Sequence, residues 1–304
     1  MRLLRGSMTA SAWIGTLRLR TLPAAASPVL LGGALAYYLG GFHALSWVAA
    51  LVGALLIQVG TNLANDYYDH VKGADTPDRA GPARASATGA LAPLAVRNAA
   101  FGVMAAAAVV GLYLVWRGGW PILAIGVAGI TSGILYTAGP KALAYTGLAD
   151  LFAFAFFGPI AVAGTVYVQT GDWAWQALAW GIPMGTLTTA ILVVNNLRDR
   201  PTDERVGKRT LAVRWGDQAM RAYWHLLVLV AAATAFAMAL LEDEVLFMLP
   251  ALTTLLVRSP SKLILGPLEP RAALNPALGG TARLLLVYAL LTSAALVATA
   301  RQAL

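Results

Sequence analysis

Long apolar stretches limit the folds open to this chain more than any other feature. Of its 304 residues, 59% are hydrophobic and only 12% are charged. About 20 apolar residues suffice for a helix to cross a bilayer, and only helices and closed barrels satisfy their backbone polar groups there. We therefore predict an all-α integral membrane protein. The expected spans are 21–41, 44–65, 95–116, 120–137, 146–168, 174–197, 221–241, 244–257 and 280–299.

The basic residues are distributed as membrane topology requires. With the N-terminus placed in the cytoplasm, only Arg117 and Arg301 of the 22 Lys and Arg fall on the outer side. The positive-inside rule thus accounts for the net charge of +8, and nothing is left to indicate a nucleic-acid partner. The nine spans then predict a cytoplasmic N-terminal segment, 1–20, which lacks the apolar core and cleavage site of a signal peptide.

Several kinds of chemistry are excluded by composition. The chain has no cysteine, which excludes disulfides, thiol nucleophiles and cysteine-bound metals. Its three histidines, His43, His70 and His225, lie far apart in sequence, so we do not expect a metal site built on histidine.

An acidic segment follows the second apolar span. Asn65 and Asp69 are four residues apart and share one helical face, and Asp66 and Asp75 lie near the same end, with Lys72 between them. Ionisable groups this close to a membrane span mark a functional site by default. Taken alone, the segment is also compatible with a solvated helix end.

A similar segment follows the sixth span. Asp199 and Asp203 share a face, with Asn195 and Asn196 a turn deeper, and Arg198 adds a cation. The following Lys208 and Arg209 supply charge for phosphate oxygens. A basic loop that happens to contain carboxylates is the alternative. Two oxygen-rich clusters on one membrane side suit Mg²⁺ bound together with a diphosphate.

These residues resemble the UbiA superfamily of intramembrane prenyltransferases, which carry two aspartate-rich motifs. The string from Asn65 to Thr76 is similar to the branch that prenylates 1,4-dihydroxy-2-naphthoate in menaquinone biosynthesis. Gly73 stands where the superfamily pattern has an acid, and Asn195 where many members have Asp. Further matching stretches are Arg18 to Pro23, Tyr136 to Pro140, Gly147 to Asp150, Phe156 to Gly158, Asn195 to Asp199 and Gly207 to Gly216.

The resemblance implies a single domain, 1–304, with nine helices in a ring around a cavity that faces the cytoplasm. It implies transfer of a polyprenyl group from polyprenyl diphosphate to dihydroxynaphthoate, with loss of CO₂ and pyrophosphate, in a bacterial inner membrane. No obligate protein partner is implied. The metal ligands would come from Asn65, Asp66, Asp69, Asp75, Asn195, Asp199 and Asp203.

The remaining roles also follow from the resemblance. Asp69, Asp199 and Lys208 are the expected catalytic residues. The expected substrate-binding residues are Arg20, Asn65, Lys72, Tyr136, Lys141, Asn196, Arg198 and Arg209. Arg18 is as good a candidate as Arg20 to meet the acceptor carboxylate or a phosphate. For these two arginines and for Lys141, anchoring at the membrane surface is an equal alternative.

Two other functions stay open from the sequence. A member of another superfamily branch would use a different aromatic acceptor, such as 4-hydroxybenzoate or homogentisate. An ion-coupled transporter would show broken helices and inverted repeats near the membrane midplane, which the sequence does not indicate.

Overall fold

The protein is described by a computed structural model covering residues 2–75 and 79–302. Every regular element in these residues is helical, which confirms the predicted all-α class. The elements are α1 (Arg2–Leu17), η1 (Leu19–Thr21), α2 (Leu22–Tyr38), α3 (Ala44–Val71), α4 (Pro93–Leu135), α5 (Leu143–Thr146), α6 (Ala149–Phe157), α7 (Pro159–Thr170), α8 (Trp175–Arg205), α9 (Leu211–Leu241), η2 (Val245–Thr253), α10 (Thr254–Leu265), η3 (Arg271–Leu274) and α11 (Asn275–Gln302).

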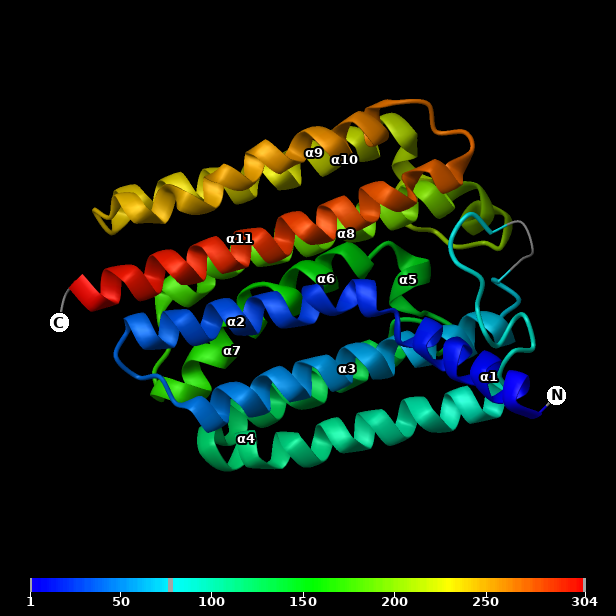
Figure 1. Cartoon of the computed structure of the whole chain (residues 1–304), viewed down its shortest axis with the longest axis horizontal. Coiled ribbons are helices and arrows are strands. Elements are labelled where there is room, and N and C mark those ends of the chain that lie inside the picture. Colours follow the sequence, from blue (N-terminus) through cyan, green and yellow to red (C-terminus); the bar gives the residue numbers. More distant parts are fainter. Residues whose placement is uncertain (1, 76–78, 303–304) are drawn as a thin grey trace.

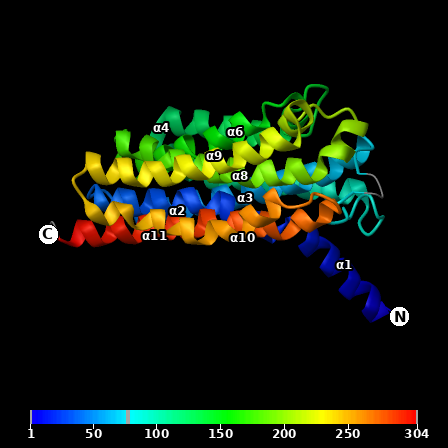
Figure 2. The same cartoon turned by 90° about the horizontal axis from the view of Figure 1, so that it is seen from above.

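The long helices run side by side along the longest axis of the molecule (Figure 1). The loops after α3 and α8 gather at the end where the chain begins, and the C-terminus lies at the opposite end. We call the end of the molecule where these two loops gather the polar end, and define it by the ends of α3 and α8 at Val71 and Arg205. Figure 2 shows α1 leaving the bundle obliquely at the polar end.

Seven helices in the described part of the chain are long and apolar enough to cross a membrane. Two predicted spans, 95–116 and 120–137, lie in the single element α4, which Gly119 interrupts with φ 67° and ψ −153°. The predicted span 244–257 falls in η2 and α10, which are not among the seven. The count of nine and the ring arrangement stay predictions.

Helix α8 is the most buried of the seven, with 72% of its most apolar window inside the protein. It packs against α6, α7, α9 and α11. At the break between α6 and α7, a Cβ on Gly158 would lie 2.6 Å from the Gly181 carbonyl oxygen of α8. Small residues permit this close approach of backbones. Packing on several sides therefore keeps α8 in the interior of the bundle.

Candidate active site at the polar end

One face of α3 leads from an apolar cavity to the acidic cluster. Ala54, Gln58 and Thr61 line the cavity, and Asn65 and Asp69 continue the same face at four-residue spacing. Asn65 and Asp69 are both buried, with exposed fractions of 7% and 2%. The Thr137 hydroxyl donates to Asn65 Oδ1 at 2.9 Å and fixes its amide. The predicted common face is thus present in the structure.

Asp69 is the most heavily contacted carboxylate of the cluster. Its Oδ2 is 3.0 Å from Arg84 Nη2, and its Oδ1 is 3.4 Å from Lys208 Nζ. The Tyr145 hydroxyl donates to the same Oδ1 at 3.3 Å. Lys208 also lies 3.7 Å from Asp203 Oδ1. Residues of both acidic segments therefore converge on Asp69.

Arg198 and Asp199 form a bidentate pair at the end of α8. Arg198 Nε and Nη2 each lie 2.7 Å from an oxygen of Asp199. The guanidinium also donates to Asn195 Oδ1 at 2.8 Å and to Asn275 Oδ1 at 2.9 Å. Two-pronged Arg–carboxylate contacts fix geometry as well as charge. The pair therefore orients Asp199 relative to α11.

Arg79 joins the two acidic segments directly. Its Nη1 is 2.6 Å from Asp75 Oδ1, and its Nη2 is 3.5 Å from Asp199 Oδ2. Burial raises the pKa of the Asp75 carboxyl to about 6, against the opposing effect of Arg79. The Arg79 pKa is raised because Asp199, Asp75 and Asp69 outweigh its own burial. The segment after α3 thus folds back over the end of α8.

The ring of Tyr145 contacts two lysines. Lys72 Nζ lies 4.4 Å and Lys208 Nζ 5.0 Å from the centre of its ring. Lys72 also donates to the carbonyls of Thr137 at 2.6 Å and Gly139 at 2.8 Å, and burial lowers its pKa. Burial and the Asp69 charge raise the pKa of Tyr145, so the phenol stays neutral and able to donate.

Tyr136 lies where the cavity meets the cluster, since it lines the cavity at the C-terminal end of α4. Its hydroxyl is within electrostatic range of both Asp150 and Asp69. Asp150 is 4% exposed, and neither of its carboxylate oxygens has a hydrogen-bond partner among the described residues.

The structure does not bring every predicted residue to the cluster. Within the described residues, Arg20, Lys141 and Arg209 have exposed side chains with no contact to the acidic residues. Asn196 is buried, also without such a contact in this part of the chain. Asp66 is buried and accepts a hydrogen bond from the Ser86 backbone N–H at 3.0 Å. The roles expected of these residues stay predictions.

Two cationic residues at the site are not singled out by the sequence. Arg79 and Arg84 come from the long loop after α3, where no periodicity predicts a side chain's position. Arg18 and Arg20 are equal candidates from the sequence, and it is Arg18 that lies within electrostatic range of Asp66, Asp69 and Asp75. The φ of 50° at Arg18 is unusual for a residue other than glycine.

The donor set suits Mg²⁺ only in partnership with a phosphate ligand. Within residues 2–75 and 79–302, no group of three or more His, Cys, Asp or Glu could hold a metal by itself. Mg²⁺ is usually held by one or two carboxylates together with substrate phosphates, so a smaller set is sufficient. Asp75 Oδ2 is buried without a partner among the described residues, which leaves one carboxylate oxygen available.

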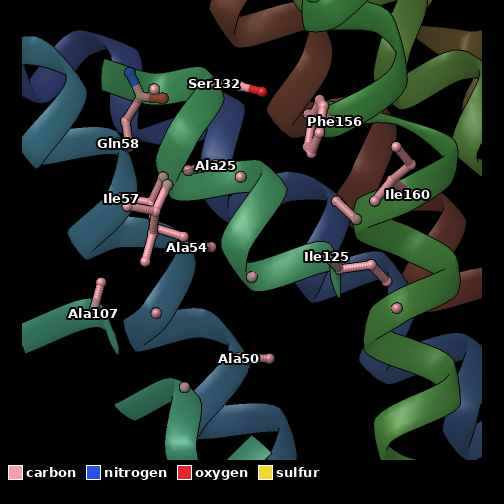
Figure 3. Close-up of a pocket in the computed structure, with 18 of the residues that line it drawn as sticks. Ala25, Ala50, Ala54, Ile57, Gln58, Ala107, Ile125, Ser132, Phe156 and Ile160 are labelled. Atoms are coloured by element: carbon pink, nitrogen blue, oxygen red, sulfur yellow. The ribbon is translucent and has the colours of Figure 1, made fainter. Parts of the chain in front are cut away.

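The cavity beside the cluster is large and almost entirely apolar. It has a volume of about 380 Å³ and is lined by residues of α2, α3, α4, α6 and α7. Figure 3 shows Ile57, Ile125, Phe156 and Ile160 projecting around it, with Gln58 and Ser132 among its few polar groups. Such a space fits a hydrocarbon chain whose polar head lies at the cluster.

A family model for the UbiA prenyltransferase family matches residues 25–263. The chain belongs to the UbiA prenyltransferase family. It is 40% identical over 231 residues to a Mycobacterium tuberculosis protein named 1,4-dihydroxy-2-naphthoate octaprenyltransferase, a match covering 75% of this chain and 78% of the relative. It is 36% identical to the Escherichia coli protein of the same name, covering 75% of each.

Solved structures show the same fold at lower sequence identity. The apo structure of a UbiA homologue from Aeropyrum pernix K1 superposes with a TM-score of 0.66 at 14% identity, covering 93% of this chain and 98% of that one. A UbiA homologue from Archaeoglobus fulgidus bound to DMAPP and Mg²⁺ gives 0.58 at 16% identity, covering 91% and 98%.

Proposed function

We propose that this UbiA-family enzyme transfers a polyprenyl group from polyprenyl diphosphate to 1,4-dihydroxy-2-naphthoate. One observation carries the proposal: the acidic ends of α3 and α8 meet, and the same face of α3, one turn before Asn65, lines a 380 Å³ apolar cavity. Relatives matched over three quarters of the chain bear the name of this activity. The product would be the prenylated naphthoquinol, the reduced form of demethylmenaquinone, formed with loss of CO₂ and pyrophosphate.

The diphosphate would bind at the polar end, with its tail in the cavity. Asp69 and Asp199 are the carboxylates that would hold Mg²⁺, and the bound metal would supply positive charge to stabilise the departing pyrophosphate. Lys208 and Arg84 both contact Asp69. A diphosphate bound beside Asp69 would therefore lie within reach of these two cations. Preorganised cations stabilise a leaving anion without reorganisation during the reaction.

Loss of pyrophosphate leaves an allylic cation near the mouth of the cavity. Tyr136 and Tyr145 are the aromatic rings at this position, and the face of an aromatic ring attracts a cation. The ring carbon of the electron-rich naphthoate that carries the carboxylate then forms the new carbon–carbon bond, and the bond from that carbon to the carboxylate breaks to release CO₂. The surrounding apolar wall excludes water, which would otherwise capture the cation.

Binding of both substrates from the cytoplasmic side follows from the charge distribution. The polar end carries the basic loops, so we place it on the cytoplasmic side of a bacterial inner membrane.

The proposal is tested with purified protein, Mg²⁺ and isotope-labelled polyprenyl diphosphate. Dihydroxynaphthoate should yield a labelled, decarboxylated product by mass spectrometry, whereas 4-hydroxybenzoate and homogentisate should yield little. Chelation of the metal should stop the reaction. A labelled product from 4-hydroxybenzoate alone would assign the enzyme to another branch, and the absence of any product with all three acceptors would reject prenyl transfer.

A further inference from the structure

Both arms of α4 contribute a glycine to the cavity wall. On the first arm Gly111 stands between the lining residues Ala107 and Val115, one turn away on either side. On the second arm Gly126 stands in the same way between Ile122 and Ile130. Residues four apart share a helical face, so each glycine is at the centre of the face that its arm turns to the cavity.

Gly111 and Gly126 have open space where a side chain would be, and their backbone angles do not require glycine. A Cβ built on Gly111 or Gly126 meets no heavy atom within 4 Å, and neither has a positive φ. By contrast, a Cβ on the neighbouring Gly133 would lie 2.5 Å from Thr61 Oγ1, so that glycine serves helix packing. Glycine weakens a helix relative to alanine. The pair thus maintains free volume in the cavity at some cost to α4.

Helix α4 doubles back at Gly119, because both of its ends lie beside the end of α3: Val96 packs with Leu63, and Thr137 accepts a hydrogen bond from Lys72. The two glycines therefore lie at similar depth, far from the diphosphate site. Gly126 precedes Tyr136 by nearly three turns, or about 15 Å along the helix. Gly111 lies about 12 Å before the break at Gly119, and Gly126 about 10 Å after it. A geranyl tail has seven main-chain carbon–carbon bonds of about 1.5 Å and so spans at most about 10 Å. It would end before this level, whereas an octaprenyl tail would pass it.

The wall beside the pair opens to the apolar exterior. Leu112, Leu123 and Val127 all line the cavity, yet they are 67%, 50% and 57% exposed. A chain longer than the cavity can therefore continue into lipid from here without meeting water. The cavity need not enclose the whole tail.

We propose that Gly111 and Gly126 determine which donors the enzyme accepts, by leaving open the passage that long polyprenyl tails need. The inference rests on the proposed prenyl transfer and adds the residues that set tail length. Side chains that fill the passage should lower kcat/KM for donors whose tails extend past Gly111 and Gly126. Donors whose tails end before these glycines should be affected much less.

The test compares donors of two lengths in three variants. Gly111→Leu and Gly126→Leu are assayed with geranyl and octaprenyl diphosphate, each with dihydroxynaphthoate. Gly102→Leu is the matched control, because Gly102 is on the first arm, is exposed, has open space around it and does not line the cavity. We expect the ratio of octaprenyl to geranyl kcat/KM to fall about tenfold or more in both lining variants. The control should keep the wild-type ratio.

Each alternative outcome is decisive. An unchanged ratio in both lining variants, with geranyl transfer retained, overturns the inference while leaving prenyl transfer intact. If the leucine variants lose both activities, Gly111→Ala and Gly126→Ala decide, because a smaller fall in the ratio must still appear. Wild-type protein inactive with both donors would instead reject the proposed function.

Discussion

At the scale of single residues, four of the site's buried carboxylates are each paired with a cation. Breaking a buried ion pair is costly because it leaves an uncompensated charge, so substrate binding must exchange partners rather than remove them. A phosphate group can take the cation while a metal takes the carboxylate. The four pairs are Asp69 with Arg84, Asp75 with Arg79, Asp199 with Arg198, and Asp203 with Lys208.

The two adjacent cations after α8 should differ sharply in effect. Lys208→Gln removes the cation 3.4 Å from Asp69, so it should raise the KM for prenyl diphosphate and slow turnover by about tenfold or more. The KM for dihydroxynaphthoate should change much less. Arg209→Gln is the matched control, since that side chain is exposed. Equal donor defects in both variants, or a defect confined to the acceptor, would contradict this placement.

The burial of Asp150 leads to a separate prediction about the free energy of unfolding. Its two buried carboxylate oxygens lack partners among the described residues, and burying a polar group without a hydrogen bond costs free energy. Asp150→Asn keeps the size and removes the charge, so it should raise the free energy of unfolding by about 1 kcal/mol. The midpoint of thermal unfolding in detergent measures this. A lower midpoint would mean that the carboxylate is stabilised by a bound water or ligand.

At the scale of elements, the helices are more predictable than the loop that completes the site. Four-residue spacing alone places Asn65 and Asp69 on one helical face. By contrast, Arg79 and Arg84 reach Asp199 and Asp69 only because the loop after α3 folds back. That path depends on long-range ion pairs, which have no local sequence signal.

The interruption of α4 is explained by the glycine at which it occurs. The predicted spans on either side, 95–116 and 120–137, leave a gap at 117–119, and the structure places the interruption at Gly119. Its backbone angles, φ 67° and ψ −153°, belong to a region that is essentially restricted to glycine. Periodicity can locate the boundary but cannot show that the two arms together wall a cavity.

Gly119→Ala should therefore destabilise the protein by about 1–3 kcal/mol, because alanine is strained at these angles. Gly102→Ala on the same helix provides the comparison. Gly102 has open space around it and no positive φ, so alanine should be neutral or slightly stabilising. Thermal unfolding in detergent distinguishes the two. Equal midpoints for both variants would show that the break tolerates side chains.

At the scale of the whole molecule, the polar end and the opposite end should face different compartments. The chain contains no cysteine, so single introduced thiols can be labelled without background. Cysteine at Ala80, in the loop after α3, should react with an impermeant reagent only after permeabilisation. Cysteine at Thr170, at the end of α7, should react in intact cells. The reverse pattern would invert the orientation that the basic residues indicate.

The central claim is that the carboxylates of α3 and α8 act as one site for metal and diphosphate. Asp69→Asn, Asp199→Asn and the double variant test it directly, with turnover measured as prenylated naphthoquinol by mass spectrometry. Asp172→Asn, in the exposed loop after α7, controls for the loss of a charge.

Each single variant should lose about 10²–10³-fold in turnover, the usual cost of a lost electrostatic contact in the transition state. Groups that act as a unit are strongly non-additive, so the double variant should be about as slow as the slower single variant. Losses that multiply in the double variant would mean two independent sites. Turnover close to wild type in both single variants would contradict the account.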